Sequence, residues 1–262
     1  MSRTLKAAGV RMSLEPYTGP FDTIAATEQV ELPMTEFWSN PKSWLNTRMD
    51  RHDLITRSVA ASGQGADARI VCAEALTGFP QDSQWTEDPA YLKPAIDWAM
   101  VSGVNQFQLH SWVQQPFGDA VKPGLTLSWW GTHFGRNQTW FKPGKDFFDY
   151  LSRCAAVLQH GAVVSDVCAL GFVAEVGDSV SPAVFRQARV RDGRIVLPNG
   201  RSYALLLLPP DTQAMLPEVA EKLRELVAAG AAVLGPRPRF SPSLAGFPAA
   251  DQTVARIGLE MW

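Results

Sequence analysis

The sequence has little that would assign it to a specialised class of protein. Its three cysteines, Cys72, Cys154 and Cys168, are widely spaced, which excludes a disulfide framework and a CxxC metal pair and indicates buried free thiols. It has no basic block, and 24 basic and 26 acidic residues give a formal net charge of −2, so nothing favours a nucleic-acid or acidic-membrane partner. It also lacks a signal peptide, an internal repeat and an apolar run long enough to span a bilayer, so we expect a soluble chain without a targeting signal.

The first part of the chain alternates between strand and helix patterns. Its 262 residues, 46% of them hydrophobic, suffice for one large α/β domain or for one and a part. The expected strands cover residues 10–15, 31–37, 70–74, 105–110 and 162–170. The expected helices cover residues 4–8, 55–61 with their flanks, 92–100 and 146–158. This alternation predicts a parallel sheet with helical crossovers.

The pattern changes after about residue 170. Turn signals at Asp192-Gly193 and Asn199-Gly200 lie between β-rich runs and predict a small meander that ends in the apolar strand 204–208. A helix that begins near Pro217 and ends at Gly230 comes next, followed by a buried strand at 231–235. The sequence begins with the end of a helix and stops within a second, incomplete α/β unit. We therefore expect the chain to be truncated at both termini.

Three acidic side chains lie at or near the ends of expected strands: Glu15, Glu36 and Glu74. Glu74 directly follows an apolar run, and an unpaired carboxylate is costly in such surroundings. It is therefore paired, metal-bound or catalytic, unless it simply reaches solvent at the strand end. Because the carboxyl ends of parallel strands converge on one rim, we expect the three acids to share a site there.

Aromatic residues accompany these acids. The chain has nine tryptophans, at least four of them in expected loops. Carboxylates beside exposed aromatic rings suit a sugar site, because pyranose C–H faces stack on indoles while hydroxyls bond to acids; packing at the rim is the alternative. Glycoside hydrolysis uses two carboxylates, one as acid and one as base or nucleophile.

A resemblance to a known family is carried by six strings, in this order: LEPYTGPFD, ELPMTEFWSNP, RIVCAEALTG, DPAYLKPAIDWAMVSGVNQFQLHSW, QPFGDAVKPGLTLSWWGTHFGRNQTWF and DYLSRCAAVLQHGAVVSDV. They resemble the catalytic barrel of glycoside hydrolase family 106, the α-L-rhamnosidases, and VRDGRIVLPNGRSYALLLLP and GPRPRFSPSLAGFPAAD resemble the domain that follows it. The resemblance implies an α/β fold in which residues 1–171 form strands 4 to 8 of a TIM-type (β/α)8 barrel. Residues 172–262 would then form a β-meander and an incomplete α/β domain.

The resemblance also implies an activity, the inverting hydrolysis of terminal α-L-rhamnosides assisted by calcium. Glu74 matches the general base that activates water, and Glu36 matches a second glutamate that binds substrate or calcium. Glu15 and Tyr17 match the rim of barrel strand 4, and His110 matches the histidine of strand 7. Four further residues are expected to bind substrate, a rhamnose-containing glycoside or polysaccharide: Trp38, Trp130, Arg136 and Trp140. Stabilising its loop is an equally good role for Arg136.

The chain also departs from the family pattern. Gln114 stands where a second histidine is usual, and the stretch after Gly171 is shortened. The family's general acid lies on an earlier barrel strand that this chain lacks, so we expect the isolated chain to have little or no activity. An exported parent, periplasmic or extracellular, would carry its signal upstream of residue 1.

Three alternatives stay open at this point. A non-catalytic carbohydrate-binding remnant would keep the aromatic rim and tolerate the loss of the acid. Another barrel glycosidase, such as a β-galactosidase-like enzyme, also places paired glutamates on barrel strands. A split reading frame would leave a chain that does not fold alone. His133, in the GTHFGRNQTW loop, is assigned to packing or to the surface.

Overall fold

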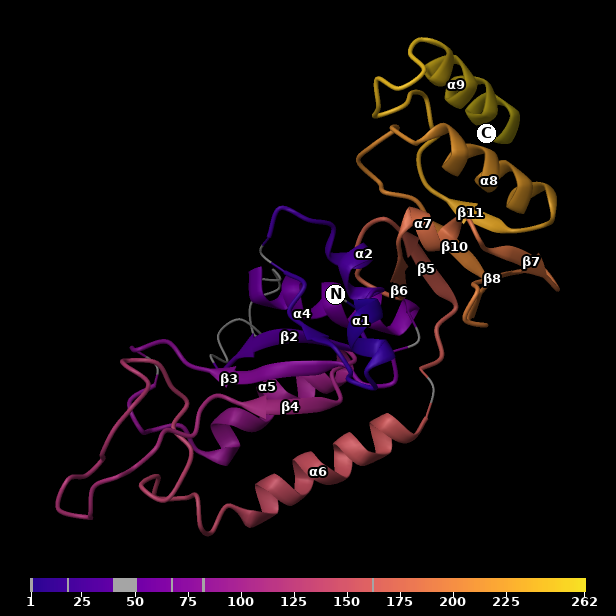
Figure 1. Ribbon diagram of the computed structural model, residues 1–262. Coiled ribbons are helices and arrows are strands. Elements are labelled where there is room, and N and C mark those ends of the chain that lie inside the picture. Colours follow the sequence, from indigo (N-terminus) through magenta and orange to yellow (C-terminus); the bar gives the residue numbers. More distant parts are fainter. Residues whose placement is uncertain (1, 18, 40–50, 67, 82, 162) are drawn as a thin grey trace. The chain divides into compact units, whose positions relative to one another are not determined.

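The computed structural model of the chain describes residues 2–17, 19–39, 51–66, 68–81, 83–161 and 163–262 (Figure 1). It forms two compact units. Unit 1 comprises Met1–Thr23, Gln29–Gly63 and Ala68–Ala162, and unit 2 comprises Ile24–Glu28, Gln64–Asp67 and Val163–Trp262. Among the described residues, no helix combines the length and the apolarity that crossing a membrane requires.

Unit 1 is built on a four-stranded parallel sheet. Its strands follow one another in chain order: β1 (Ser13–Leu14), β2 (Leu32–Trp38), β3 (Cys72–Thr77) and β4 (Gln106–Leu109). The helices of this part of the chain are α1 (Ser2–Ala7), α2 (Thr23–Thr27, which enters unit 2), α4 (Arg51–Gly65), α5 (Pro89–Val101) and α6 (Lys145–His160). The sequence prediction of a parallel sheet with helical crossovers is confirmed. The (β/α)8 barrel itself stays a prediction.

One face of this sheet is buried under helices. In β2, Thr35 and Phe37 are buried, whereas Glu36 and Trp38 on the opposite face are only half-buried. Leu92, Ile96 and Ala99 of α5 share one side of their helix and join the same apolar cluster as Phe37. Because a strand alternates its side chains between two faces, burying the odd-numbered residues of β2 leaves Glu36 on the other face.

Unit 2 contains two further sheets. The first is parallel, with strand order β11 (Ala232–Leu234), β10 (Leu205–Leu207), β5 (Val167–Leu170), β6 (Asp178–Val180). The second is the predicted meander, formed by the antiparallel strands β7 (Arg189–Arg191), β8 (Arg194–Val196) and β9 (Ser202–Tyr203). The helices are α7 (Pro182–Phe185), α8 (Pro217–Ala228) and α9 (Ala249–Met261). Gly230, with φ +98°, follows the end of α8 and suits the left-handed backbone found there.

The strand expected at residues 162–170 forms, but not in the sheet of the first part. As β5, it lies between β10 and β6 in unit 2. This corrects the expectation that it follows β4 in one sheet. Its sequence, VCAL, is apolar throughout, and such a run fits the centre of any parallel sheet, so its pattern does not choose the partner strands. The functional division into a catalytic barrel over 1–171 and a following domain over 172–262 stays a prediction.

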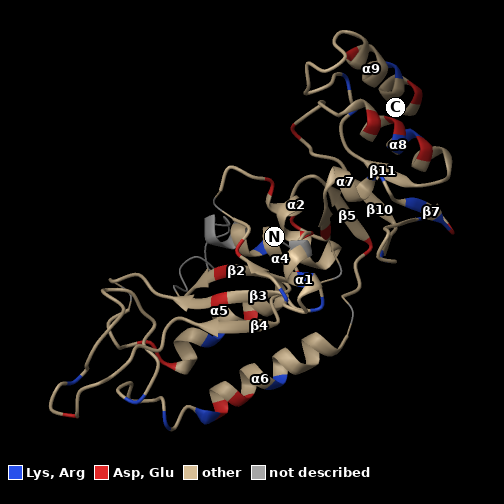
Figure 2. Cartoon of the chain, viewed as in Figure 1, with Lys and Arg blue, Asp and Glu red and all other residues tan. Residues whose placement is uncertain are grey.

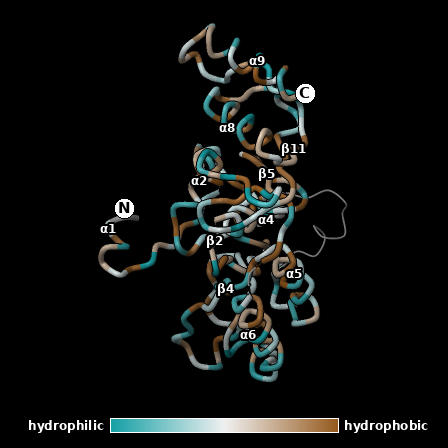
Figure 3. The backbone as a smooth tube through the Cα atoms, turned by 90° about the vertical axis from the view of Figure 1, so that its right-hand side faces the viewer, coloured by the Kyte–Doolittle hydropathy of each residue, from teal (hydrophilic) through white to brown (hydrophobic). Residues whose placement is uncertain are grey.

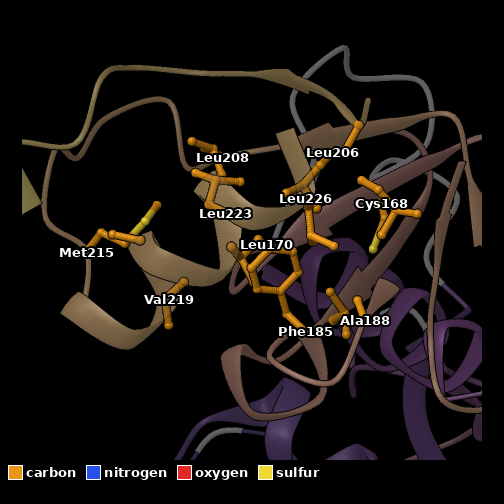
Figure 4. Close-up of a cluster of buried hydrophobic side chains, with 14 of the residues drawn as sticks. Cys168, Leu170, Phe185, Ala188, Leu206, Leu208, Met215, Val219, Leu223 and Leu226 are labelled. Atoms are coloured by element: carbon orange, nitrogen blue, oxygen red, sulfur yellow. The ribbon is translucent and has the colours of Figure 1, made fainter. Parts of the chain in front are cut away.

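A single apolar cluster fills unit 2 (Figure 4). Leu206 of β10 and Cys168 of β5 are fully buried, as are Leu223 and Leu226 of α8. The hydropathy of the residues agrees with their burial (Figure 3). Hydrophobic residues predominate along the strands around β5, whereas hydrophobic and hydrophilic residues alternate along α6. The three cysteines are free thiols, and Cys72 and Cys168 are buried, as predicted; Cys154 is half-buried.

Candidate active site

Glu36 and Glu74 lie in one row across the first sheet. Glu36 of β2 is paired in register with Glu74 of β3, which is paired in turn with Gln108 of β4. In-register residues of parallel strands point to the same face, so these three polar side chains extend from the face that the helices leave open. Acidic colour marks both β2 and β3 (Figure 2). The structure therefore brings together the two glutamates that the sequence predicts as catalytic.

A bulge at Leu76 orients the end of β3. Phe37 pairs with Ala75 but Trp38 pairs with Thr77, so Leu76, with φ +70°, is an extra residue in its strand. In a regular strand Thr77 would face away from Glu74, three positions earlier. The extra residue turns Thr77 back to the face of Glu74, and its hydroxyl donates to Glu74 Oε1 over 2.8 Å. A non-glycine residue in the left-handed region is strained, and such strain gathers at functional sites.

Glu15 and Tyr17 extend the acidic cluster from the segment after β1. The Tyr17 hydroxyl donates to Glu36 Oε2 over 3.2 Å. Burial is the main cause that raises the pKa of Glu36 above its ordinary value, and the charge of Glu74 raises it further, against lowering by Tyr17, Trp38 and His110. Burial likewise raises the pKa of Glu15, to which Glu74 and Glu36 add. Burial and the charges of Glu36 and Glu15 raise the pKa of Tyr17, which keeps its hydroxyl a donor.

His110 follows β4 and is fixed by a backbone carbonyl. Its Nδ1 lies 2.8 Å from the oxygen of Gly131. Because a carbonyl only accepts, Nδ1 carries the proton, and in the neutral ring Nε2 is left as an acceptor. Gly131 is itself held by reciprocal backbone bonds with Gly78, of 2.6 and 3.2 Å. The loop around Gly131 is thereby fixed to the end of β3, next to the glutamates.

An aromatic cluster borders the acids. The rings of Trp38 and Phe79 lie 4.2 Å apart, and Trp130 lies 5.6 Å from Trp38 and 6.0 Å from Phe79 between ring centroids. Trp38 is two residues from Glu36 on the same face of β2. The sequence predicts both Trp38 and Trp130 as substrate-binding, and the structure places them together at this end of the sheet.

Two other predicted substrate-binding residues have structural partners. Trp140 packs against Phe134, Phe147 and Phe148, and its Nε1 donates to the carbonyl of Glu87 over 2.5 Å. The Nη2 of Arg136 donates to the backbone oxygens of Gln115 and Phe117, over 3.0 and 2.7 Å. These contacts describe Trp140 as part of the packing of α6, and Arg136 as a residue that holds its loop.

Glu87, Ser83 and His133 form a buried polar group near Gly131 that the sequence does not predict. Glu87 is 1% exposed and accepts a hydrogen bond from the Ser83 hydroxyl. His133 is also buried, stacks on Trp85 at 4.2 Å between centroids, and has its pKa lowered mainly by burial. A Cβ at Gly131 would lie 1.6 Å from Ser83 Oγ, so only glycine fits there. This polar group therefore supports the backbone that fixes His110.

The acidic cluster does not amount to a metal site by itself. Calcium takes six to eight oxygen ligands, of which carboxylates are the commonest charged kind. Within the part of the chain that the structure describes, no three His, Cys, Asp or Glu side chains are grouped so as to hold an ion.

Comparisons with known proteins show the family and the fold of the chain. A family model described as alpha-L-rhamnosidase, of glycoside hydrolase family 106, matches residues 3–175 and 178–262. A protein of Formosa agariphila, named provisionally as a beta-glucuronidase, is 33% identical over 97% of this chain and 22% of its own length. The solved structure of a rhamnosidase from Novosphingobium sp. PP1Y has the same fold, with a TM-score of 0.81 and 24% identity over 97% of this chain and 26% of its own. The chain thus spans about a quarter of the length of these relatives.

Proposed function

The chain belongs to the alpha-L-rhamnosidase family, glycoside hydrolase family 106, and on this basis we propose that it contributes the base side of a site that hydrolyses terminal α-L-rhamnosides. The observation that carries the proposal is the register of Glu36 with Glu74 on adjacent parallel strands, beside Trp38 and Trp130. We further propose that β1 to β4 are consecutive strands of a (β/α)8 barrel, in which this row of side chains faces the interior.

Glu74 is the proposed general base. Its carboxylate takes a proton from a water molecule, whose oxygen attacks the anomeric carbon while the bond to the leaving oxygen breaks. Thr77 occupies one lone pair of Oε1 and so fixes the direction in which the remaining lone pairs point. Glu74 is half-buried, so its carboxylate stays accessible to a water molecule and to a bound sugar.

Glu36 is not the general acid of an inverting reaction in this proposal. Acid and base of an inverting pair are separated by about 6.5–9.5 Å, because the water must fit between base and sugar. Adjacent strands lie only about 4.8 Å apart, and Glu36 and Glu74 are directly paired. We assign Glu36 to the substrate's hydroxyl groups or to one coordination position of calcium. The general acid then comes from residues outside this chain.

A single experiment on the intact chain tests the assignment of the base. α-L-Rhamnosyl fluoride needs no protonation of its leaving group, so a site with a base but no acid hydrolyses it. We expect fluoride release by the chain, loss of that release in Glu74→Gln, and β-L-rhamnose as the first product. Alkyl α-L-rhamnosides, whose leaving oxygen needs the acid, should not react.

A retaining glycosidase is the second candidate. Retaining pairs lie about 5–5.5 Å apart, which the direct pairing of Glu36 with Glu74 favours, and one relative is named as a beta-glucuronidase. Here Glu74 would be the nucleophile and Glu36 the acid. This candidate predicts hydrolysis of an aryl β-D-glucuronide with the retained β anomer as first product, and no reaction with the rhamnosyl fluoride.

A further inference from the structure

The segment after β4, residues 111–130, presents aromatic surface to solvent. We call it the platform loop. Trp112 is 74% exposed and Trp129 is 66% exposed. Phe117, Leu125 and Leu127 of the same segment are also exposed. Exposed apolar patches of this kind mark binding sites in folded proteins, because burying such rings would otherwise stabilise the fold. The loop follows β4 and extends away from the sheet, to the left in Figure 1.

The platform loop is held in a defined shape by side-chain bonds to its backbone. The Gln115 amide donates to the carbonyl of Leu125 over 2.7 Å and accepts from its N–H over 2.9 Å. Arg136 binds two carbonyls of the same loop, and Asn137 Nδ2 donates to the carbonyl of Pro123 over 2.7 Å. These bonds fix the backbone that carries the two indoles, so the rings are presented at reduced entropic cost to a ligand.

Both exposed tryptophans are close in sequence to residues of the candidate active site. Trp129 precedes Trp130, whose ring packs against Trp38 and Phe79 beside Glu36. Trp112 comes two residues after His110, and its ring edge meets Phe141 at 6.0 Å between centroids. One edge of Trp112 is therefore packed while most of its surface stays open.

The charge of the platform loop indicates the class of ligand. Its two charged residues, Asp119 and Lys122, have opposite signs and pair with each other over 3.4 Å. Because Lys122 is paired with Asp119, the loop has no net positive charge of the kind that binds nucleic acid or an anionic polymer. Flat, uncharged indole faces suit the C–H faces of neutral pyranose rings, because stacking removes water from between the two apolar surfaces.

We propose that Trp112 and Trp129 form a subsite for the neutral sugar units next to the terminal residue, so that the substrate is an oligosaccharide or polysaccharide rather than a rhamnoside of a small aglycone. This inference rests on the proposed function. It assigns the terminal sugar to Glu36 and Glu74 and the following units to the platform loop.

Titration calorimetry on the intact chain tests this inference with two ligands, L-rhamnose and a neutral trisaccharide ending in α-L-rhamnose. We expect the trisaccharide to bind about five- to tenfold more tightly, and Trp112→Ala and Trp129→Ala each to lower the ratio of the two affinities towards one. Trp262→Ala, which removes a part-exposed indole of unit 2, should keep the ratio of the wild-type chain.

Two results would overturn the inference while leaving the proposed function intact. In the first, the trisaccharide binds no more tightly than L-rhamnose. In the second, the Trp112 and Trp129 variants keep the wild-type ratio. Failure of the wild-type chain to bind either ligand would instead contradict the proposed function, and this inference with it. Near-ultraviolet circular dichroism of each variant checks that its remaining tryptophans keep their environment.

Discussion

Glu36 and Glu74 extend from paired positions of adjacent parallel strands, and each carboxylate has its own hydroxyl donor. Tyr17 donates to Glu36 from the segment after β1, and Thr77 donates to Glu74 from the end of β3. The two donors hold two like-charged groups next to each other in a half-buried setting. This costs stability at neutral pH, and proteins accept such a cost where a site has to act.

Glu36→Gln is expected to stabilise the fold at neutral pH. Burial and the charge of Glu74 raise the pKa of Glu36 above its ordinary value of 4.5, so the folded state favours the protonated form. The stability that Glu36 contributes is present below about pH 4.5 and is lost as pH rises through the folded-state pKa. The neutral glutamine avoids this loss, so the variant should unfold at a higher urea concentration than the wild-type chain near pH 7.

Urea unfolding of the wild-type chain and Glu36→Gln, from about pH 4 to about pH 7, measures this difference. The variant's advantage should shrink as pH falls. Glu221→Gln, at an exposed position of α8, is the matched control and should lack this trend. A Glu36→Gln variant less stable than the wild-type chain at pH 7 would refute the account of like-charge strain.

Thr77 is expected to position Glu74. Thr77→Val keeps the shape of the side chain but removes the donor to Oε1, and a hydrogen bond to a charged group contributes about 1.5–3 kcal/mol. Hydrolysis of α-L-rhamnosyl fluoride should fall about 10- to 100-fold, mainly in kcat. Thr77→Ser, which restores the hydroxyl, should recover most of the rate. Equal rates for the valine and serine variants would show that the hydroxyl has no positioning role.

His133 should lower the stability of the fold in mild acid. Burial lowers its pKa below the ordinary 6.5, against the charge of Glu87 and a hydrogen bond to the Ser83 backbone, which raise it. The stability that it contributes is present above about pH 6.5 and is lost as pH falls through the folded-state pKa. The urea midpoint of the wild-type chain should therefore drop, relative to that of His133→Gln, between about pH 7.5 and about pH 5.5. His160→Gln, exposed at the end of α6, serves as control; if it behaved like His133→Gln, burial would not be the cause.

A buried ion pair should dominate the electrostatics of unit 2. Asp178 is 1% exposed and accepts from Arg201 over 2.6 Å and from the Tyr203 hydroxyl over 2.8 Å. Asp178→Asn removes the negative charge that is buried beside the guanidinium of Arg201 and should cost about 3–5 kcal/mol of unfolding free energy. The double variant Asp178→Asn/Arg201→Met should recover part of this loss, because the guanidinium is then removed together with the buried negative charge. Glu260→Gln, which breaks exposed pairs with Arg224 and Arg256, should leave the midpoint unchanged.

The strands and the two central acids could be predicted from the sequence because both depend on local signals. An apolar run followed by an acid predicts Glu74 at a strand end, whereas in the structure β3 continues to Thr77 and Glu74 lies within it. The parallel arrangement of β2 and β3 brings Glu36 beside Glu74, as expected. The bulge could not be predicted, because leucine at position 76 carries no signal for a left-handed backbone. The donor to Glu74 was missed for the same reason, since regular alternation turns Thr77 to the other face.

The surroundings of several other residues depend on tertiary contacts, which the sequence pattern does not specify, and the substrate-binding roles of Trp140 and Arg136 stay predictions. Trp140 and Arg136 lie in the loop-rich segment before α6, where an aromatic or cationic side chain serves packing and sugar binding equally well. Glu87 could not be predicted as part of the site, because it directly precedes Asp88, the N-cap of α5, and its sequence context is that of a helix start. Its partner Ser83 and the nearby His133 are separate in sequence, and only the fold brings them together. The pairing of β5 with β10 also joins two strands that are remote in sequence.

The most direct test of the central claim is the hydrolysis of α-L-rhamnosyl fluoride by the intact chain, followed by fluoride release and by proton NMR of the first product. The account predicts release by the wild-type chain, β-L-rhamnose as the first product, and loss of release in Glu74→Gln. Release that persists in Glu74→Gln, or a first product with the α configuration, would contradict the assignment of Glu74 as the base of an inverting site.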